Sequence, residues 1–354
     1  MKRDLLLLIG IVAILIPLNL RAQDGPKISG FVQGMYIANL DENGDLESNQ
    51  FQMRRVRMSV SGTLFKNLSY KIQGDFTRKP MLVDVFVKYK VCDEFAIQVG
   101  QFKLPFTYES PLNPVDLEIF DYGESVKHLV GYKDVSGVGS IGRDLGIMAT
   151  GNLFKLEGKD FPLFTYSLGL FNGNGANEED NNNRKDLVGR LDFHPMLKDL
   201  TLTGSYYYGM YLKDAANNGA RNRWSAGAQY SDGRVLVRGE YINGNTGYFD
   251  GTLDTNGNPI ELTRNSTGYY AVAGYNFLLG KDKTQKLMPV FRYEYYEPGD
   301  MSGTASGSTT YYTAGINYWP LKSLNLKLDY TLIQNVLGTT NNTHRVVAMV
   351  NYKF

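Results

Sequence analysis

Hydrophobic and polar residues alternate along the last twelve residues of the chain, Thr343 to Phe354. One row is apolar or aromatic from Val346 onward, whereas the other row carries Arg345 and Lys353. A period of two residues is typical of a β-strand, because successive side chains point to opposite faces of a sheet. The C-terminus is therefore predicted to be a strand with one apolar face and one mostly polar face.

The same alternation recurs along most of the chain. Clusters of Gly, Asn and Asp, which favour turns, separate the alternating segments. Short connections alternate with longer ones, as in a barrel with tight turns at one end and loops at the other. Sixteen strands are predicted, at residues 28–38, 52–64, 68–77, 82–90, 95–102, 143–151, 163–171, 185–193, 200–209, 221–230, 234–243, 267–277, 286–295, 309–318, 323–333 and 343–354.

The apolar row of each predicted strand lacks Asp, Glu, Lys and Arg in its central part and uses Gly, Ala and terminal aromatics freely. A soluble sandwich also has apolar rows, but with larger interlocking side chains on fewer strands. An uncharged band with aromatic ends suits contact with lipid, where only a closed barrel satisfies every backbone group of a sheet. The predicted fold is all-β, a transmembrane antiparallel β-barrel of about sixteen strands.

The opposite row is polar and holds most charges of the strands, with more bases than acids. Sixteen strands leave an aqueous channel, so this row is predicted to line the channel. The side chains predicted to line an anion path are Arg55, Arg57, Lys71, Lys88, Arg190, Arg238, Arg292 and Arg345. The alternative is that acids of the same row pair with these bases, which then only solvate the lumen.

The N-terminus has the pattern of a secretory signal peptide. Lys2 and Arg3 precede an apolar run that is too short to span a membrane, and Ala22 is a small residue suited to cleavage. The predicted division is a signal peptide over residues 1–22 and a barrel over residues 23–354. Loss of the signal peptide changes the net charge from +1 to −1, so no global attraction to nucleic acid is expected.

The longest connection, residues 103–142, has little alternation. A long irregular stretch inside a compact domain is usually functional. It is predicted to fold inward as a constriction, with Lys103, Lys127 and Lys133 along the solute path. The alternative is an extracellular flap.

No catalytic or metal-binding pattern is recognised, and no cofactor or enzymatic activity is predicted. Residues 137–142 match G-x-G-x-x-G but lack the strand and helix that a dinucleotide site needs. Neither a metal site nor a Ser-His-Asp triad can be built from the three histidines. The lone Cys92 is expected at a turn. Residues 175–184 are predicted to be a solvated acidic loop, with divalent-cation binding as the alternative.

Four stretches together carry a family resemblance. They are residues 51–62 (FQMRRVRMSVSG), 95–106 (FAIQVGQFKLPF), 142–147 (GRDLGI) and 169–173 (GLFNG). From about residue 28 onward, the chain resembles the phosphate-selective porin O and P family. The resemblance implies a trimeric, sixteen-stranded outer-membrane channel with an inward third loop and a basic lumen, to which Arg55 and Arg57 are the matched residues. Phe354 resembles the assembly signal that ends outer-membrane barrels.

The predicted function is a passive outer-membrane porin that passes small anions such as phosphate. The alternative is a general or carbohydrate-passing channel without anion selectivity, because inward aromatics could stack on sugars; these are Phe31, Phe86, Tyr207, Tyr270 and Tyr311. The predicted location is the bacterial outer membrane. Expected partners are membrane lipid and lipopolysaccharide, small anions, the barrel-assembly machinery and further copies of the chain in a homotrimer.

Overall fold

The computed structural model describes residues 25–155, 157–195, 197, 199–212, 214, 218–301, 305–336 and 342–354. The predicted signal peptide lies outside these residues. The strands are β1 Lys27–Leu40, β2 Leu46–Phe65, β3 Leu68–Asp75, β4 Leu82–Lys90, β5 Ala96–Lys103, β6 Arg143–Lys155, β7 Pro162–Phe171, β8 Asp186–Phe193, β9 Leu200–Leu212, β10 Asn218–Ser231, β11 Val235–Tyr248, β12 Leu262–Tyr275, β13 Phe277–Leu279, β14 Gln285–Glu297, β15 Thr309–Leu321, β16 Leu324–Asn335 and β17 Thr343–Lys353.

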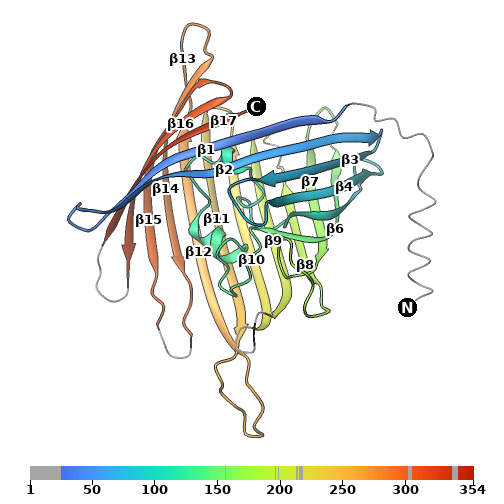
Figure 1. The fold of residues 1–354 in the computed structure, drawn as a ribbon. Helices are drawn as coiled ribbons and strands as arrows, with labels where there is room; N and C mark the ends of the chain where they lie inside the picture. Colours follow the sequence, from blue (N-terminus) through green and yellow to red (C-terminus); the bar gives the residue numbers. More distant parts are fainter. Residues whose placement is uncertain are drawn as a thin grey trace.

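These strands form one closed antiparallel barrel (Figure 1). Each strand pairs with its neighbours in sequence, and β1 also pairs with β17, so the sheet has no open edge strand. β12 and β13 both pair with β14 and form one barrel strand interrupted at Asn276. The barrel therefore has sixteen strands, and each of the sixteen predicted segments is confirmed as a strand.

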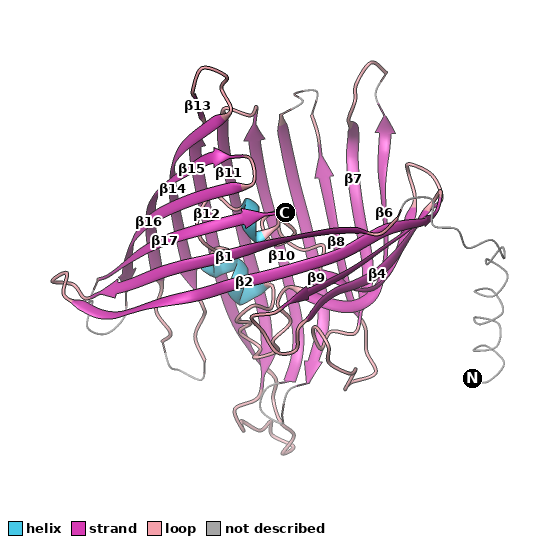
Figure 2. Ribbon diagram, turned by 45° about the horizontal axis from the view of Figure 1, so that its top comes forward, coloured by secondary structure: helices cyan, strands magenta, loops and turns pink. Residues whose placement is uncertain are grey.

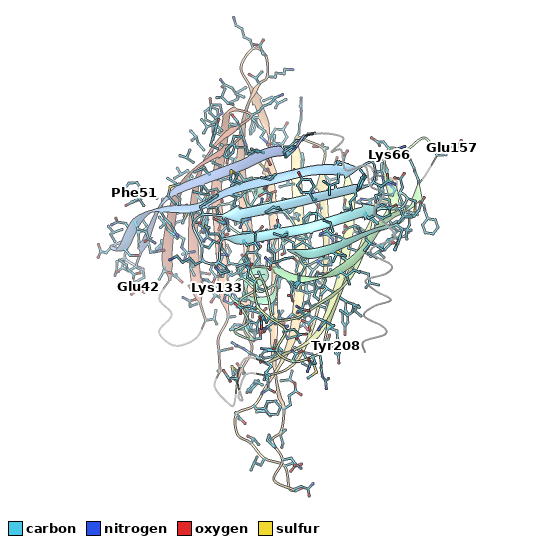
Figure 3. All side chains as sticks on the ribbon, turned by 45° about the vertical axis from the view of Figure 1, so that its right-hand side comes forward. Glu42, Phe51, Lys66, Lys133, Glu157 and Tyr208 are labelled. Atoms are coloured by element: carbon cyan, nitrogen blue, oxygen red, sulfur yellow. The ribbon has the colours of Figure 1, made fainter. Side chains whose placement is uncertain are left out.

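The largest difference from prediction lies at β2, which begins at Leu46 rather than at residue 52. Residues 46–52 pair with β1, but the ladder to β3 reaches only to Arg57. Solvent surrounds both faces of this part of the hairpin, so it has no apolar row for the sequence to reveal. Figure 3 labels Glu42 and Phe51 near the projecting tip.

The alternating strand directions place both chain ends of the barrel at one rim. The connections after β1, β3 and β5 lie at the other rim, together with the long connection after β11 that projects at the bottom of Figure 1. The tight turns lie at the rim of the termini, and Cys92 is exposed in one of them, between β4 and β5, as predicted.

The two faces of the barrel differ as the alternation predicts. Large apolar side chains are exposed on the outside, among them Ile147, Leu168, Leu191, Phe291, Leu328 and Val350. Outward tyrosines stack across strands, with 5.0 Å between the ring centroids of Tyr269 and Tyr295. An apolar surface of this extent with aromatic clusters is suited to lipid rather than to water. In the described part of the chain, no helix is long and apolar enough to cross a membrane.

The segment after β5, residues 104–142, is packed against the inward row of the wall. It contains a short 3-10 helix, η1 Pro114–Asp116, and one helix, α2 Glu124–Leu129, which contacts β11, β12 and β14. Figure 2 shows this helical part among the strands. Its apolar side chains and those of the wall form one buried cluster that includes Phe106, Leu117, Val126, Leu129, Tyr207, Ile242, Val272 and Val290. The inward row therefore includes apolar side chains where this segment rests.

Candidate functional site: the inward wall and the segment 104–142

The register of strands β1 to β4 confirms that Arg57 and Lys71 lie on the same face of the sheet. Arg57 lies opposite both Phe31 and Asp75, and Lys71 lies opposite Phe86 on the same face. The Arg57 Nε donates a hydrogen bond to the Asp75 carboxylate over 2.9 Å, and the guanidinium lies 5.7 Å from the Phe31 ring centroid. Arg57 thus has an acidic partner and an aromatic cover within the wall itself.

Other wall cations bind acids of the segment 104–142. Arg55 donates to Asp121 over 2.9 Å, and Arg54 and Lys127 also contact this carboxylate. Burial alone raises the carboxyl pKa, but these three cations outweigh it and hold the pKa of Asp121 well below its ordinary value of 3.8. Asp121 is therefore ionised and attaches the segment to β2.

The opposite side of the barrel repeats this arrangement. Arg238 on β11 donates to Glu118 over 2.5 Å, and Arg292 on β14 donates to Glu109 over 2.5 Å. Arg223 on β10 forms a two-point ion pair with Asp134, which lies beyond α2. Arg–carboxylate pairs with two parallel hydrogen bonds combine charge with fixed geometry. The acids of one segment therefore engage arginines from several parts of the wall.

Backbone groups of the segment complete its attachment. The Lys327 ammonium on β16 donates to the carbonyls of Leu117 and Ile119, and the Asp329 carboxylate accepts the N–H of Phe120. Lys103 at the end of β5 donates to the carbonyls of Ser110 and Leu112 and to the Tyr122 hydroxyl. Lys103 thus orders the base of the segment and has no acidic partner among the described residues.

The predicted lining residues fall into two groups by exposure. Arg55, Arg57, Arg238 and Arg292 are buried, with at most 3% of the side chain exposed. Lys71 and Arg190 are partly exposed and pair with Asp84 and Asp192, whereas Lys88, Arg345 and the exposed Lys133 have no acidic partner within salt-bridge distance among the described residues. The Arg345 Nε donates to the Asn39 side chain over 3.1 Å.

The acids of the segment 104–142 that pair with the wall arginines were not identified from the sequence. Glu109, Glu118, Asp121 and Asp134 lie in a segment without alternation, so no pattern assigns them to a wall position. The available signal was composition alone, since a long segment predicted to enter a basic lumen contains several acids. When these four acids are counted with those of the wall, most of the surplus positive charge on the inward row has an acidic partner.

Some unpaired cations inside the barrel are more accessible than the unpaired acids. The inward acids without a cation within salt-bridge distance include Glu240 and Asp144, which are at most 4% exposed and accept hydrogen bonds from nearby donors. Of the corresponding cations, Lys327 is buried and donates to backbone carbonyls, whereas Lys88 and Arg345 are partly exposed. Among the described residues, no group of three or more His, Cys, Asp or Glu side chains could hold a metal ion.

A comparison with protein-family models gives a match over residues 27–354 to the family described as phosphate-selective porin O and P. The chain belongs to this family. The sequence resemblance is thereby confirmed over nearly the whole chain, and with the barrel it places this porin in the bacterial outer membrane as a channel. None of the curated proteins matches the chain by sequence.

Solved porin structures share the fold at low sequence identity. The anion-selective porin from Comamonas acidovorans superposes with a TM-score of 0.66 at 14% identity, covering 93% of this chain and 99% of that chain. OmpF of Salmonella typhi, solved as a complex with daunomycin, gives 0.65 at 15% identity, covering 93% and 97%. The outer-membrane channel DcaP of Acinetobacter baumannii gives 0.60 at 13% identity, also covering 93% and 97%. At these identities the likeness concerns the fold alone.

Proposed function

We propose that this porin is a passive diffusion channel that prefers small anions. The observation that carries the proposal is the difference in accessibility between unpaired charges of opposite sign inside the barrel. Lys88 and Arg345 face water without an acidic partner, whereas Glu240 and Asp144 are buried beneath hydrogen-bond donors. Accessible charge sets the potential along a water-filled path, because charges focused by low-dielectric walls act on passing ions.

The buried arginines have a supporting role in this proposal. Arg55, Arg238 and Arg292 hold the segment 104–142 against the wall through its acids, and we propose that this segment narrows the lumen. A passing anion would meet the exposed cations one after another. Several weak sites suit passage better than one tight site, because an ion must leave as readily as it enters.

The more specific proposal is that phosphate is among the anions that pass through the channel. One structural neighbour is itself an anion-selective porin, which supports an anion path here. The terminal nitrogens of the Arg345 guanidinium have no acid within salt-bridge distance among the described residues. A guanidinium can donate two parallel hydrogen bonds to an oxyanion. Stacking of sugars on the inward aromatic rings has less support. Tyr207 and Tyr270 are buried, and their hydroxyls donate hydrogen bonds to Asp186 and Glu240.

Planar-bilayer recordings in asymmetric potassium chloride test the proposal. The reversal potential should have the sign of an anion-preferring channel, and inorganic phosphate should reduce the chloride current. A reversal potential near zero, with the current reduced by oligosaccharides instead, would favour the general or carbohydrate-passing channel. A cation-preferring reversal potential would overturn both the anion preference and the role given to the exposed cations.

A homotrimer is the assembly that we propose, since one structural neighbour, OmpT of Vibrio cholerae, is described in a trimer form. Lipid and lipopolysaccharide on the outer face, and barrel-assembly machinery during insertion, are the further partners proposed. Native mass spectrometry of the detergent-extracted protein tests the trimer. A mass of one chain under conditions that keep the barrel folded would contradict it.

A further inference from the structure

A cavity of about 380 Å³ lies where the end of α2 and the following turn meet the wall at the rim opposite the termini. It is lined mainly by polar groups. His128, Lys133 and Asp134 come from the segment 104–142, Arg264 comes from β12, and Tyr296 comes from β14. Three separate elements thus meet around one open hollow at the mouth of the channel.

Two cations in this cavity have no acidic partner within salt-bridge distance among the described residues. Lys133 is exposed, and Arg264 is partly exposed. The Arg264 Nε donates to the carbonyls of Pro298 and Gly299 over 2.7 and 3.1 Å, while its two terminal nitrogens make no hydrogen bond to the described residues. The Arg264 side chain is therefore fixed through its Nε, and its two terminal amino groups remain available to a ligand.

The acids around the cavity are already neutralised. Asp134 forms the two-point pair with Arg223, and Glu124 pairs with Lys127 over 2.8 Å. His128 lies 3.8 Å from Glu124. Burial lowers the pKa of His128 from 6.5, although Glu124 partly opposes this effect. At neutral pH the net charge of the cavity is therefore positive and comes from Lys133 and Arg264.

A second observation also indicates a ligand. Tyr296 is 5% exposed, and its hydroxyl makes no hydrogen bond of good geometry to the described residues, although the Ser266 side chain lies nearby. The Tyr296 ring stacks on His128 with 4.5 Å between the ring centroids, which fixes its position in the cavity wall. An unpaired buried hydroxyl has a free-energy cost that a bound acceptor could remove.

From these features we infer that the cavity binds the oxyanion group, phosphate or carboxylate, of a small solute before it enters the lumen. Arg264 would supply a fork of two donors, Lys133 a mobile point charge and Tyr296 a hydroxyl donor. This inference rests on the proposed anion-preferring channel and adds to it a first binding site at the mouth. It uses none of the buried arginines that hold the segment 104–142.

The test is block of chloride current by inorganic phosphate and, separately, by succinate in planar bilayers at constant ionic strength. Lys133→Gln and Arg264→Gln should each raise the half-blocking concentration about tenfold, because each removes a charge-assisted contact with the bound anion. Lys281→Gln is the matched control, since Lys281 is an exposed lysine in the turn before β14, at the other rim. Whichever of the two anions blocks more strongly identifies the group that the site prefers.

Arg264→Gln also removes an anchor of the loop after β14, so folding is checked by heat modifiability on electrophoresis. Lys133 makes no side-chain hydrogen bond to the described residues, and Lys133→Gln therefore tests the site without this complication. Unchanged block in Lys133→Gln and in folded Arg264→Gln would overturn the site. If the wild-type reversal potential still shows anion preference in that case, the proposed function stands and only the mouth site fails.

Discussion

Arg55 and Asp121 are 66 positions apart in the chain, yet the Arg55 guanidinium donates to the Asp121 carboxylate over 2.9 Å. Only 1% of the Arg55 side chain and 5% of the Asp121 side chain are exposed. Removing one member of a buried ion pair leaves an uncompensated charge, which is more costly than the pair is stabilising. The pair therefore attaches the segment 104–142 to β2 rather than offering a free cation to a passing ion.

Asp121→Asn should loosen this attachment. Arg54, Arg55 and Lys127 would lose the carboxylate that they share, at a cost of about 3 kcal/mol. We expect a lower temperature of heat modification, together with higher and noisier single-channel conductance as the segment moves and Arg55 becomes accessible.

Asp232→Asn is the matched control, since Asp232 is an exposed acid in the turn between β10 and β11. Equal unfolding temperature and equal conductance in Asp121→Asn and Asp232→Asn would mean that the Asp121 contacts do not hold the segment.

The dependence of the segment on pH follows from its carboxyl groups. Burial raises the pKa of Glu118 and Asp134, but Arg238 and Arg223 outweigh burial and lower these pKa values below the ordinary 4.5 and 3.8. A lowered pKa gives stabilisation that is complete above the ordinary value and is lost as the pH falls below it. The ion pairs of Glu118 and Asp134 should therefore persist from pH 7 to about 5 and weaken below about 4, with noisier conductance as the segment loosens. The same conductance and noise at about pH 3 as at pH 7 would contradict this assignment.

The C-terminal residue closes the barrel seam. The Phe354 N–H donates to the Gly30 carbonyl over 3.0 Å, and the Gly30 N–H donates to the Phe354 carbonyl over 2.9 Å. A Cβ atom at Gly30 would lie within 2.5 Å of both the Arg57 carbonyl oxygen and the Phe354 ring, so glycine is needed where β1 packs between β2 and the C-terminal residue. We predict that deleting Phe354 impairs assembly far more than it lowers the stability of barrels that do assemble.

Outer-membrane yield and heat modification measure these two effects separately. Normal amounts of folded protein in the deletion strain would argue against an assembly role for Phe354.

The signal peptide stays a prediction for the purified protein. The short apolar run that ends at Ala22 indicates cleavage after this residue, so the mature N-terminus should be Gln23. Edman sequencing or intact mass of the outer-membrane protein measures it directly, and a mass that retains residues 1–22 would refute the prediction.

The wall of the barrel was predictable because lipid and water impose alternation on every strand. The inward parity of Arg55, Arg57 and Lys71 follows from that period, and the register confirms it. The early start of β2 was not predictable, since a strand exposed on both faces has no apolar row. Nor were the arginine partners that lie in the segment 104–142, because the position of Asp121 depends on tertiary packing of an irregular segment. Sequence could therefore place the cations on the wall but could not distinguish the paired from the accessible ones.

The central claim is that accessible cations, rather than the buried arginines, set the ion preference of the channel. The direct test is the reversal potential of a variant in which Lys88, Lys133 and Arg345 are replaced by Glu. Its control replaces Lys66, Lys281 and Lys322 by Glu, which are exposed lysines in turns at the rim of the termini and give the same change in charge (Figure 3 labels Lys66 and Lys133). We predict that the first variant shifts from anion toward cation preference, while the control keeps the wild-type value. An unchanged reversal potential in the folded first variant would contradict the account.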